Sequence, residues 1–227
     1  RRIRNFLLQK GYTTSTVSHT IEETPAGINV TFNINEGNSS IIREITFTGN
    51  TIASNRAIKN KLALKEIGLF KDGAYQPSTL EQDKQTIVKY YHERGYADAA
   101  VIDVKIDSVT NEEKQRDELT ILFVIQEGAQ YTYSGIRISG NEVFSESELL
   151  RNQKLKSGQI FNETKFQEDI SSITNVYYEN GYMSNEFYPV PVKDADRHEI
   201  SYDLTIREHT RSHIENIIIK GNTKTKE

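Results

Sequence analysis

Three short motifs, Gly-Asn, Gly-Tyr and Glu-Gly, recur along this chain of 227 residues, and their order and spacing constrain the fold more than any other feature. Besides residues 37–38, Gly-Asn occurs at residues 49–50, 140–141 and 221–222, each time 12 residues after the end of a strand-like run, at Gly37, Gly128 and His209. Gly-Tyr occurs at residues 11–12, 95–96 and 181–182, so successive copies are 84 and 86 residues apart. Self-similarity at a fixed period indicates an array of repeated units.

The segments between Gly-Asn and Gly-Tyr have helical patterns. In the middle copy, Ser78 and Glu81 predict a capping box, and Gly95 predicts a left-handed helix end. Ser54 and Ser145 are predicted to cap two shorter helices, the second with its own capping box to Glu148. The apolar residues expected on one face of the long helices are Leu80, Ile87, Val88 and Tyr91 in the middle copy and Phe166, Ile173 and Tyr177 in the next copy.

Strand patterns with a period of two flank these helices, for example in residues 119–125 and 200–206. Each complete unit therefore reads β-α-α-β-β. The predicted fold class is α+β, in which tandem units each have a three-stranded mixed sheet covered on one face by two helices. Four segments follow from this pattern: a C-terminal half-unit at 1–37, complete units at 41–128 and 132–208, and the first strand of a further unit within 213–227, at 214–219.

Composition excludes several classes of function. The chain has no cysteine, which rules out disulfides, a thiol nucleophile and thiolate metal sites. Its net charge of -4 gives no basic face of the kind that nucleic-acid binding usually uses. No apolar run approaches the roughly 20 residues of a membrane-spanning helix. We therefore predict no nucleic-acid partner and no transmembrane helix in this segment.

Titratable residues give no convincing catalytic or metal site. His209 and His213 have the spacing of a helical zinc pair, but they lie in a predicted link between strands. Asp194 and Asp196 are better explained by a polar hairpin turn than by a calcium loop. No nucleophile elbow, zinc-protease motif or phosphate-binding loop occurs. The sequence predicts a protein that is not an enzyme and has no cofactor and no metal.

The ordered repeat resembles the POTRA domain. The resemblance rests on Tyr-Tyr-x-x-x-Gly-Tyr at residues 90–96 and on the run Tyr-Thr-Tyr-Ser-Gly-Ile-Arg-Ile-Ser-Gly-Asn at residues 131–141. The second run is similar to the start of the fourth POTRA unit of BamA-type outer-membrane assembly factors. On that match, the chain would hold the end of the second unit, the third and fourth units, and the first strand of the fifth.

The resemblance implies a function and a location. BamA-type factors carry POTRA units in the periplasm, attached to a C-terminal membrane β-barrel of the same full-length chain in the cell outer membrane. The expected function is outer membrane protein assembly, meaning protein insertion into the membrane. The implied partners are unfolded outer-membrane protein clients and accessory assembly lipoproteins.

Two other functions remain open. The arm of a two-partner secretion transporter is also built from POTRA units. A sheet with two helices also occurs in KH modules, which bind nucleic acid through a Gly-x-x-Gly loop. Residues 66–73 and 156–159 lie at the corresponding position and do not fit that loop.

Two prolines point to a binding edge. Pro189 and Pro191 lie at alternate positions of one strand, which is tolerated only at an open sheet edge. An offset of 86 residues places Asp103 and Lys105 at the same positions in the middle copy, where every N–H is kept. An extended polypeptide is therefore predicted to add to that strand by β-augmentation.

The edge prediction specifies donors and faces. The outward N–H donors, and so the predicted peptide-binding residues, are Val101, Asp103, Lys105 and Asp107. The side chains expected to point at the helices are Ile102, Val104 and Ile106. The residues expected to have only structural roles in turns and caps are Gly49, Asn50, Gly95, Tyr96, Gly140, Asn141, Gly181 and Tyr182.

Overall fold

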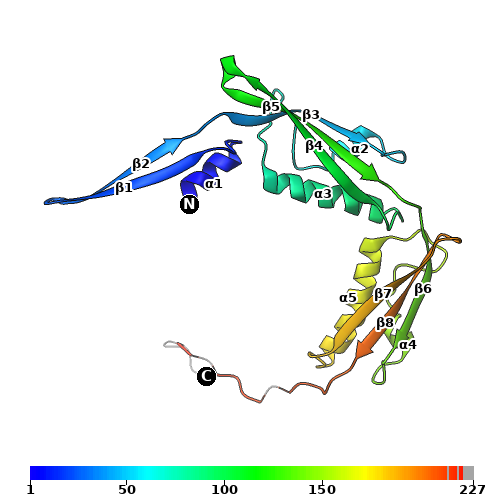
Figure 1. The fold of residues 1–227 in the computed structure, drawn as a ribbon. Coiled ribbons are helices and arrows are strands. Elements are labelled where there is room, and N and C mark those ends of the chain that lie inside the picture. Colours follow the sequence, from blue (N-terminus) through cyan, green and yellow to red (C-terminus); the bar gives the residue numbers. More distant parts are fainter. Residues whose placement is uncertain (214, 219, 222–227) are drawn as a thin grey trace. The chain divides into compact units, whose positions relative to one another are not determined.

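The structure, a computed structural model, describes residues 1–213, 215–218 and 220–221 (Figure 1). The chain separates into two compact units. The first contains residues 1–92 and 96–128, and the second contains residues 93–95 and everything from residue 129 onward.

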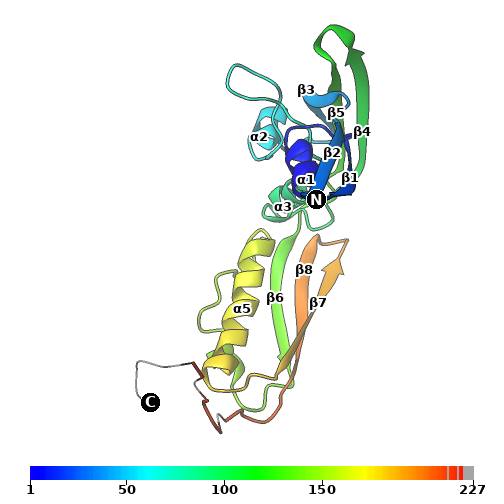
Figure 2. The ribbon, with the colours of Figure 1, turned by 90° about the vertical axis from the view of Figure 1, so that its left-hand side faces the viewer.

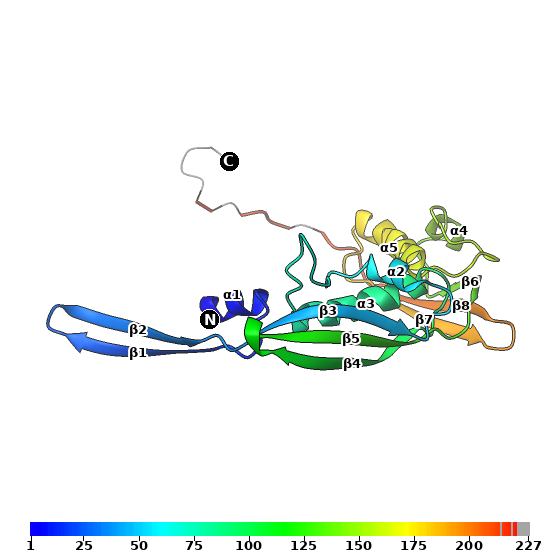
Figure 3. The ribbon, with the colours of Figure 1, turned by 90° about the horizontal axis from the view of Figure 1, so that it is seen from above.

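The first unit contains a three-stranded mixed sheet in the order β3-β5-β4, in which β3 and β5 are parallel and β4 and β5 are antiparallel. Figure 3 shows the three strands side by side with β5 in the middle. The elements are α1 (Arg2–Gln9), β1 (Thr16–Thr24), β2 (Gly27–Asn35), β3 (Ser39–Thr48), α2 (Asn55–Lys59), α3 (Pro77–His92), β4 (Ala100–Asn111), the 3-10 turn η1 (Glu112–Lys114) and β5 (Arg116–Gln126).

The second unit repeats this arrangement with the strand order β6-β8-β7. Its elements are β6 (Thr132–Ser139), α4 (Glu146–Leu149), α5 (Glu163–Glu179), β7 (Glu186–Asp194) and β8 (Glu199–Arg207). Figure 2 shows α5 along one face of this sheet. The two sheets with helices on one face confirm the predicted α+β class.

Alternate side chains of the strands point toward the helices and form the hydrophobic core. On β5, Ile121 and Phe123 are fully buried, and they pack with Ile87 and Tyr91 of α3 in one cluster. Phe123 stacks on Phe47 of β3 with the ring centroids 5.6 Å apart. Burying an aliphatic or aromatic side chain of this size contributes about 1.5–3 kcal/mol, so this face provides the main driving force for the fold.

The Gly-Asn motif follows the first strand of each unit, and its glycine packs directly against the backbone of the last strand. Gly49 has φ +82°, and a Cβ atom there would lie 1.9 Å from the carbonyl oxygen of Ile125. A Cβ at Gly140 would lie 2.1 Å from the oxygen of Ile206. These distances leave no room for a side chain. The following Asn50 amide donates to the carbonyl of Ala53 at 2.9 Å, and Asn141 makes the equivalent bond to Phe144 at 3.0 Å.

The Gly-Tyr motif ends the long helix. Gly95 and Gly181 both have left-handed backbone, with φ of +88° and +87°. The N–H of Tyr182 then turns back to the carbonyl of Tyr177 at 3.0 Å, and Tyr96 does the same to Tyr91 at 3.2 Å. Such a 6→1 bond after a glycine is the Schellman helix end.

The glutamate at the end of the last strand of each unit accepts hydrogen bonds from the segment that follows the Gly-Asn motif. Glu127 accepts the N–H of Ile52 at 3.0 Å and also the hydroxyl of Thr51. In the second unit, Glu208 accepts the N–H of Val143 at 3.1 Å and the hydroxyl of Tyr177 at 2.7 Å. One carboxylate thus joins the last strand to the loop after Gly-Asn, and in the second unit it also reaches the long helix.

The two capping-box predictions have different outcomes. The Ser145–Glu148 capping box is confirmed, with both reciprocal bonds present. The Ser78–Glu81 box is wrong because α3 begins at Pro77, two residues before the start that an N-cap at Ser78 requires, so Ser78 already lies inside the first turn. Proline at the first helical position needs no N–H partner. The side chain of Glu81 pairs instead with Lys84 at 3.0 Å.

The two ends of the chain differ from the complete units. The β1–β2 hairpin (Figure 3) has apolar residues at alternate positions of β2. Their side chains are exposed, Ile28 by 67% and Phe32 by 55%. The strand predicted at 214–219 is not formed within residues 215–218. Residues 214, 219 and 222–227, where the rest of that prediction falls, lie outside the described residues.

We expect the second unit to lose stability in alkaline solution. Burial raises the pKa of Tyr133 to about 12, whereas in the unfolded chain tyrosine titrates near 10. The unfolded state therefore loses this proton first, and the stabilisation falls as the pH rises from about 10 to 12, by about 2 kcal/mol. Urea unfolding at pH 8 and pH 11.5 measures the loss. Tyr133→Phe should lose less stability over that interval, and an equal loss would contradict the assignment.

Candidate functional site

Strand β4 lies at the edge of the first sheet, and β7 lies at the edge of the second. β4 has 12 residues and pairs with β5 along its whole length. Edge strands present unpaired N–H and C=O groups that another strand can meet. The two edges are equivalent in topology, and they differ in sequence.

A β-bulge at Ile102 changes which side chains face the core. Val101 is opposite Ile125 and Asp103 is opposite Val124, so Ile102 has no partner on β5. The prediction that Ile102 points at the helices is therefore wrong, and its side chain is 58% exposed. Val101, with its predicted outward donor, packs against the core together with Val104. Ile106 points to the helix side as predicted, because its partner is the buried Ile121.

The bulge also shifts the outward N–H groups by one residue. The N–H of Val104 donates to the carboxylate of Asp103 at 2.8 Å, which places this donor on the side away from β5. Amides along a strand alternate between its two sides. The free edge of β4 after the bulge therefore presents the donors of Val104, Ile106 and Ser108. This corrects the predicted donors Asp103, Lys105 and Asp107 by one position, whereas Val101 precedes the bulge and keeps its predicted phase.

The prolines of β7 indicate the same alternation of outward and inward N–H groups. Pro189 is opposite Leu204 and Pro191 is opposite Tyr202. The matching positions in the first sheet are opposite Phe123 and Ile121, and they are held by Val104 and Ile106. The predicted counterparts, Asp103 and Lys105, are one residue too early because an offset of 86 ignores the bulge. β7 thus lacks donors at the two positions where β4 keeps them.

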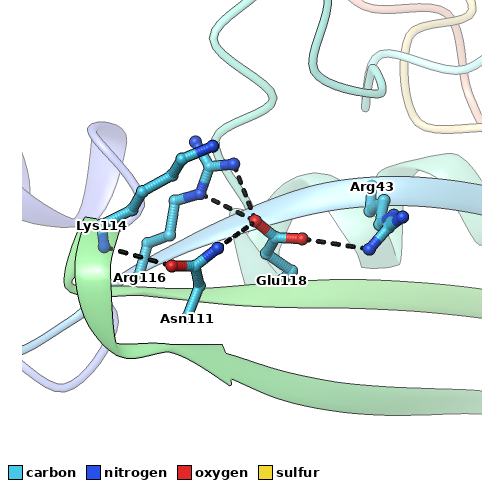
Figure 4. A network of polar contacts seen from close by, with 5 residues as sticks. All are labelled: Arg43, Asn111, Lys114, Arg116 and Glu118. Atoms are coloured by element: carbon cyan, nitrogen blue, oxygen red, sulfur yellow. Dashed lines mark hydrogen bonds and ion pairs between the residues drawn. The ribbon is translucent and has the colours of Figure 1, made fainter.

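The far end of the β4 edge is held by a polar network around Glu118 (Figure 4). Arg116 donates to Glu118 at 2.7 and 3.1 Å, and Asn111 of β4 donates at 3.3 Å. Arg43 of β3 pairs with the same carboxylate at 3.3 Å. Arg116 in particular holds the pKa of Glu118 below its usual value. All three strands are thus joined where the β4–β5 hairpin begins to turn.

The solvent face of β4 carries the remaining predicted residues. Asp103, Lys105 and Asp107 are all exposed and alternate in charge. Val109, on the same face, is 71% exposed. The edge therefore combines free backbone groups with a mixed polar and apolar surface and carries no buried charged group of the kind that chemistry would need.

The residues considered above as metal ligands make hydrogen bonds that stabilise turns and links. Asp194 accepts the N–H groups of Asp196 and Arg197 at 3.1 and 3.0 Å, which makes it a turn residue. The N–H of His209 donates to Asn185 at 2.8 Å. Within residues 1–213, 215–218 and 220–221, no cluster of three or more potential metal ligands occurs. No helix in this part of the chain is long and apolar enough to cross a membrane.

Comparisons with known proteins agree with the geometry. A family model described as "POTRA: Surface antigen variable number repeat" matches residues 40–128 and 131–209. A protein of Treponema pallidum named "Putative outer membrane protein assembly factor" is 34% identical over 99% of this chain and 27% of its own length. The outer membrane protein assembly factor BamA of Nitratidesulfovibrio vulgaris is 27% identical over 100% of the chain and 29% of its own length.

Solved structures show the same fold. The POTRA3–5 segment of Haemophilus influenzae BamA matches with a TM-score of 0.63 and 25% identity, over 82% of this chain and 73% of that one. BamA of Haemophilus ducreyi lacking POTRA domains 1–3 matches with a TM-score of 0.56 and 21% identity, over 74% of this chain and 29% of that one. The chain spans less than a third of the length of the Treponema and Nitratidesulfovibrio relatives.

Proposed function

This chain belongs to the POTRA family, and from that premise we propose that it is a periplasmic, non-enzymatic part of an outer-membrane β-barrel assembly factor. In this role it holds unfolded outer-membrane proteins before their insertion. The names of the relatives support the assignment, since two of them are BamA proteins or assembly factors matched over nearly all of this chain.

The domain organisation is part of the proposal. Residues 41–128 and 132–208 are complete POTRA units, residues 1–37 are the C-terminal half of a preceding unit, and residues 213–227 begin a following one. The likeness to a structure of POTRA units three to five supports numbering the two complete units as the third and fourth. The remaining partners are a C-terminal membrane β-barrel in the full-length chain and accessory assembly lipoproteins.

The observation that carries the proposal is the open β4 edge, with outward N–H groups at Ile106 and Ser108 and a third at Val104, which the Asp103 carboxylate accepts until a client strand takes its place. Strand addition uses main-chain hydrogen bonds, which any client sequence except proline supplies. A factor that handles many different unfolded proteins needs this tolerance. A second strand added to β4 would also gain contacts with the exposed Ile102 and Val109.

Two alternatives make different predictions. A two-partner secretion arm would bind one cognate passenger rather than many client strands. A KH-like module would bind single-stranded RNA in a salt-dependent way, which a chain with a net charge of -4 does not favour. Binding assays with unrelated barrel-strand peptides and with RNA separate these functions from client holding.

The edge is tested by transferring the prolines of β7 to β4. Val104→Pro with Ile106→Pro removes two outward donors while leaving the inward donors that pair with β5. We expect the affinity for an extended barrel-strand peptide to fall about 5- to 150-fold, since each of the two lost backbone hydrogen bonds costs about 0.5–1.5 kcal/mol. Chemical-shift changes of residues 100–111 on peptide titration measure the binding.

The matched control is Val104→Ala with Ile106→Ala, which removes the same side chains and keeps both N–H groups. It should retain most of the affinity. If the double proline variant is poorly folded by circular dichroism, Ile106→Pro alone is compared with Ile106→Ala. Equal peptide affinity in the folded proline and alanine variants would contradict strand addition at this edge.

A further inference from the structure

The loop between α2 and α3 in the first unit contains a segment that the second unit lacks. At the base of this loop, the N–H of Ile67 donates to the carbonyl of Ile42 at 2.8 Å. On the other side, the N–H of Ile42 donates to the carbonyl of Gly73 at 2.7 Å. The loop is thus held to β3 at both ends, and five residues, Gly68–Asp72, lie between the two points.

The equivalent loop of the second unit closes without those five residues. The N–H of Gly158 donates to the carbonyl of Tyr133 on β6, and the N–H of Tyr133 donates to the carbonyl of Gln159, both at 2.8 Å. Gly158 and Gln159 are neighbours in the chain. The fold therefore does not need the additional segment in order to close.

The added segment is an ordered turn with an apolar tip. Gly68 and Lys71 exchange backbone hydrogen bonds at 3.0 and 3.3 Å. Leu69 and Phe70 lie between them, with 96% and 99% of their surface exposed. Side chains this exposed add nothing to the stability of the folded chain, and adjacent exposed apolar groups of this size mark interaction sites.

Cationic side chains surround the base of this tip. A hollow of about 370 Å³ beside Leu69 and Phe70 is also lined by Lys59, Lys65 and Lys71. The one acidic residue of that lining, Glu66, pairs with Lys59 at 2.7 Å. The lining therefore carries two more positive charges than negative ones, whereas the chain as a whole has a net charge of -4. Asp72, just beyond the turn, uses its carboxylate to accept the N–H of Ala74 at 3.3 Å.

We propose that Leu69 and Phe70 insert into the surface of a membrane that contains anionic phospholipids. In a bilayer, the apolar layer lies behind a layer of phosphate groups. The tip presents complementary chemistry, with two fully exposed apolar side chains and three lysines lining the hollow beside them. Lysine stems can extend along apolar surface while the ammonium groups stay at the phosphates.

A single pair of inserted side chains gives weak and reversible attachment. Even one lipid chain gives only marginal membrane binding. The contact therefore acts where the chain is already close to a membrane, as the proposed function places it. It concerns a different surface from the β4 edge, so either proposal can fail without the other.

The test uses the absence of tryptophan from this chain. Phe70→Trp makes the tip residue the only tryptophan, and its emission reports the polarity around it. With vesicles of phosphatidylglycerol and phosphatidylethanolamine, the emission should shift to shorter wavelength, and lipids brominated in the acyl chain should quench it. Adding Lys65→Glu and Lys71→Glu should weaken the partitioning by about tenfold or more, since each lysine contributes to attraction by anionic lipid.

The matched control is Phe6→Trp on α1, where Phe6 is 59% exposed and lies away from the turn in sequence. Its emission should not change with vesicles. An unchanged emission of the Phe70→Trp protein at millimolar lipid would overturn the proposal. It would also be overturned by an emission shift that needs protein concentration and no lipid, because the tip would then bind a second copy of the chain.

Discussion

Replacing Gly140 by alanine should unfold the second unit under mild conditions. The new Cβ atom would lie 2.1 Å from the carbonyl oxygen of Ile206, so the strand β6 and the strand β8 would have to separate. The left-handed backbone at φ +78° adds strain. We expect a loss of about 4 kcal/mol or more, which is a large part of the stability of a small domain. Urea unfolding followed by hydrogen exchange of peptides from residues 132–207 measures it.

Gly158→Ala is the matched control in the same unit. Gly158 has a similar φ of +84°, but no atom lies within 4 Å of the position that its new Cβ atom would take. Only the backbone strain remains, so the expected loss is about 1 kcal/mol. Comparable losses of stability at the two glycines would show that the left-handed backbone alone, rather than the close approach of Gly140 to Ile206, explains why the Gly-Asn motif requires glycine.

Removing the buried carboxylate of Asp83 should destabilise the first unit nearly as strongly. Asp83 accepts the N–H of Ala63 at 2.6 Å and that of Leu64 at 2.8 Å. Burial raises the pKa of this carboxyl, and the two amide donors oppose that rise. Asp83→Ala leaves two N–H groups without an acceptor, at a cost of about 1–3 kcal/mol for each buried group. We expect a total loss of about 3–5 kcal/mol, measured by urea unfolding.

Asp107→Ala is the control for that variant, because Asp107 is exposed on β4 in the same unit. A surface substitution of this kind usually changes stability by less than about 0.5 kcal/mol. Asp83→Asn keeps one acceptor oxygen and should lie between the two. If Asp83→Ala and Asp107→Ala had similar midpoints, the loop amides of Ala63 and Leu64 would have to be satisfied by water.

The fold could be predicted because each repeated motif has a specific structural role. Glycine precedes asparagine where β3 meets β5 and where β6 meets β8, since a Cβ atom would collide with a carbonyl there. The glutamate at the strand end recurs because the loop after Gly-Asn needs an acceptor, as for Ile52. Features imposed by geometry in every unit leave a periodic trace in the sequence.

The details of the candidate site could not be predicted in the same way. The bulge at Ile102 adds one residue to β4, and no glycine or proline marks it. An alignment of helix ends alone cannot place it, so the predicted donors are displaced by one position. The prolines of β7 do show which positions have outward N–H groups, because a proline in a strand must occupy an outward donor position. The added turn at Leu69 is visible only as a difference in length between the two units.

On the proposed function, the paired prolines of β7 limit the number of client strands that this segment can add. A chain with two open β4-like edges could be bridged by one long client, or joined to a second copy into an open-ended stack of sheets. If β4 adds client strands as proposed, Pro189 and Pro191 deprive β7 of the donors that the same addition would need. The segment would then hold a client by one stretch of backbone and leave the rest of the client chain free to move on.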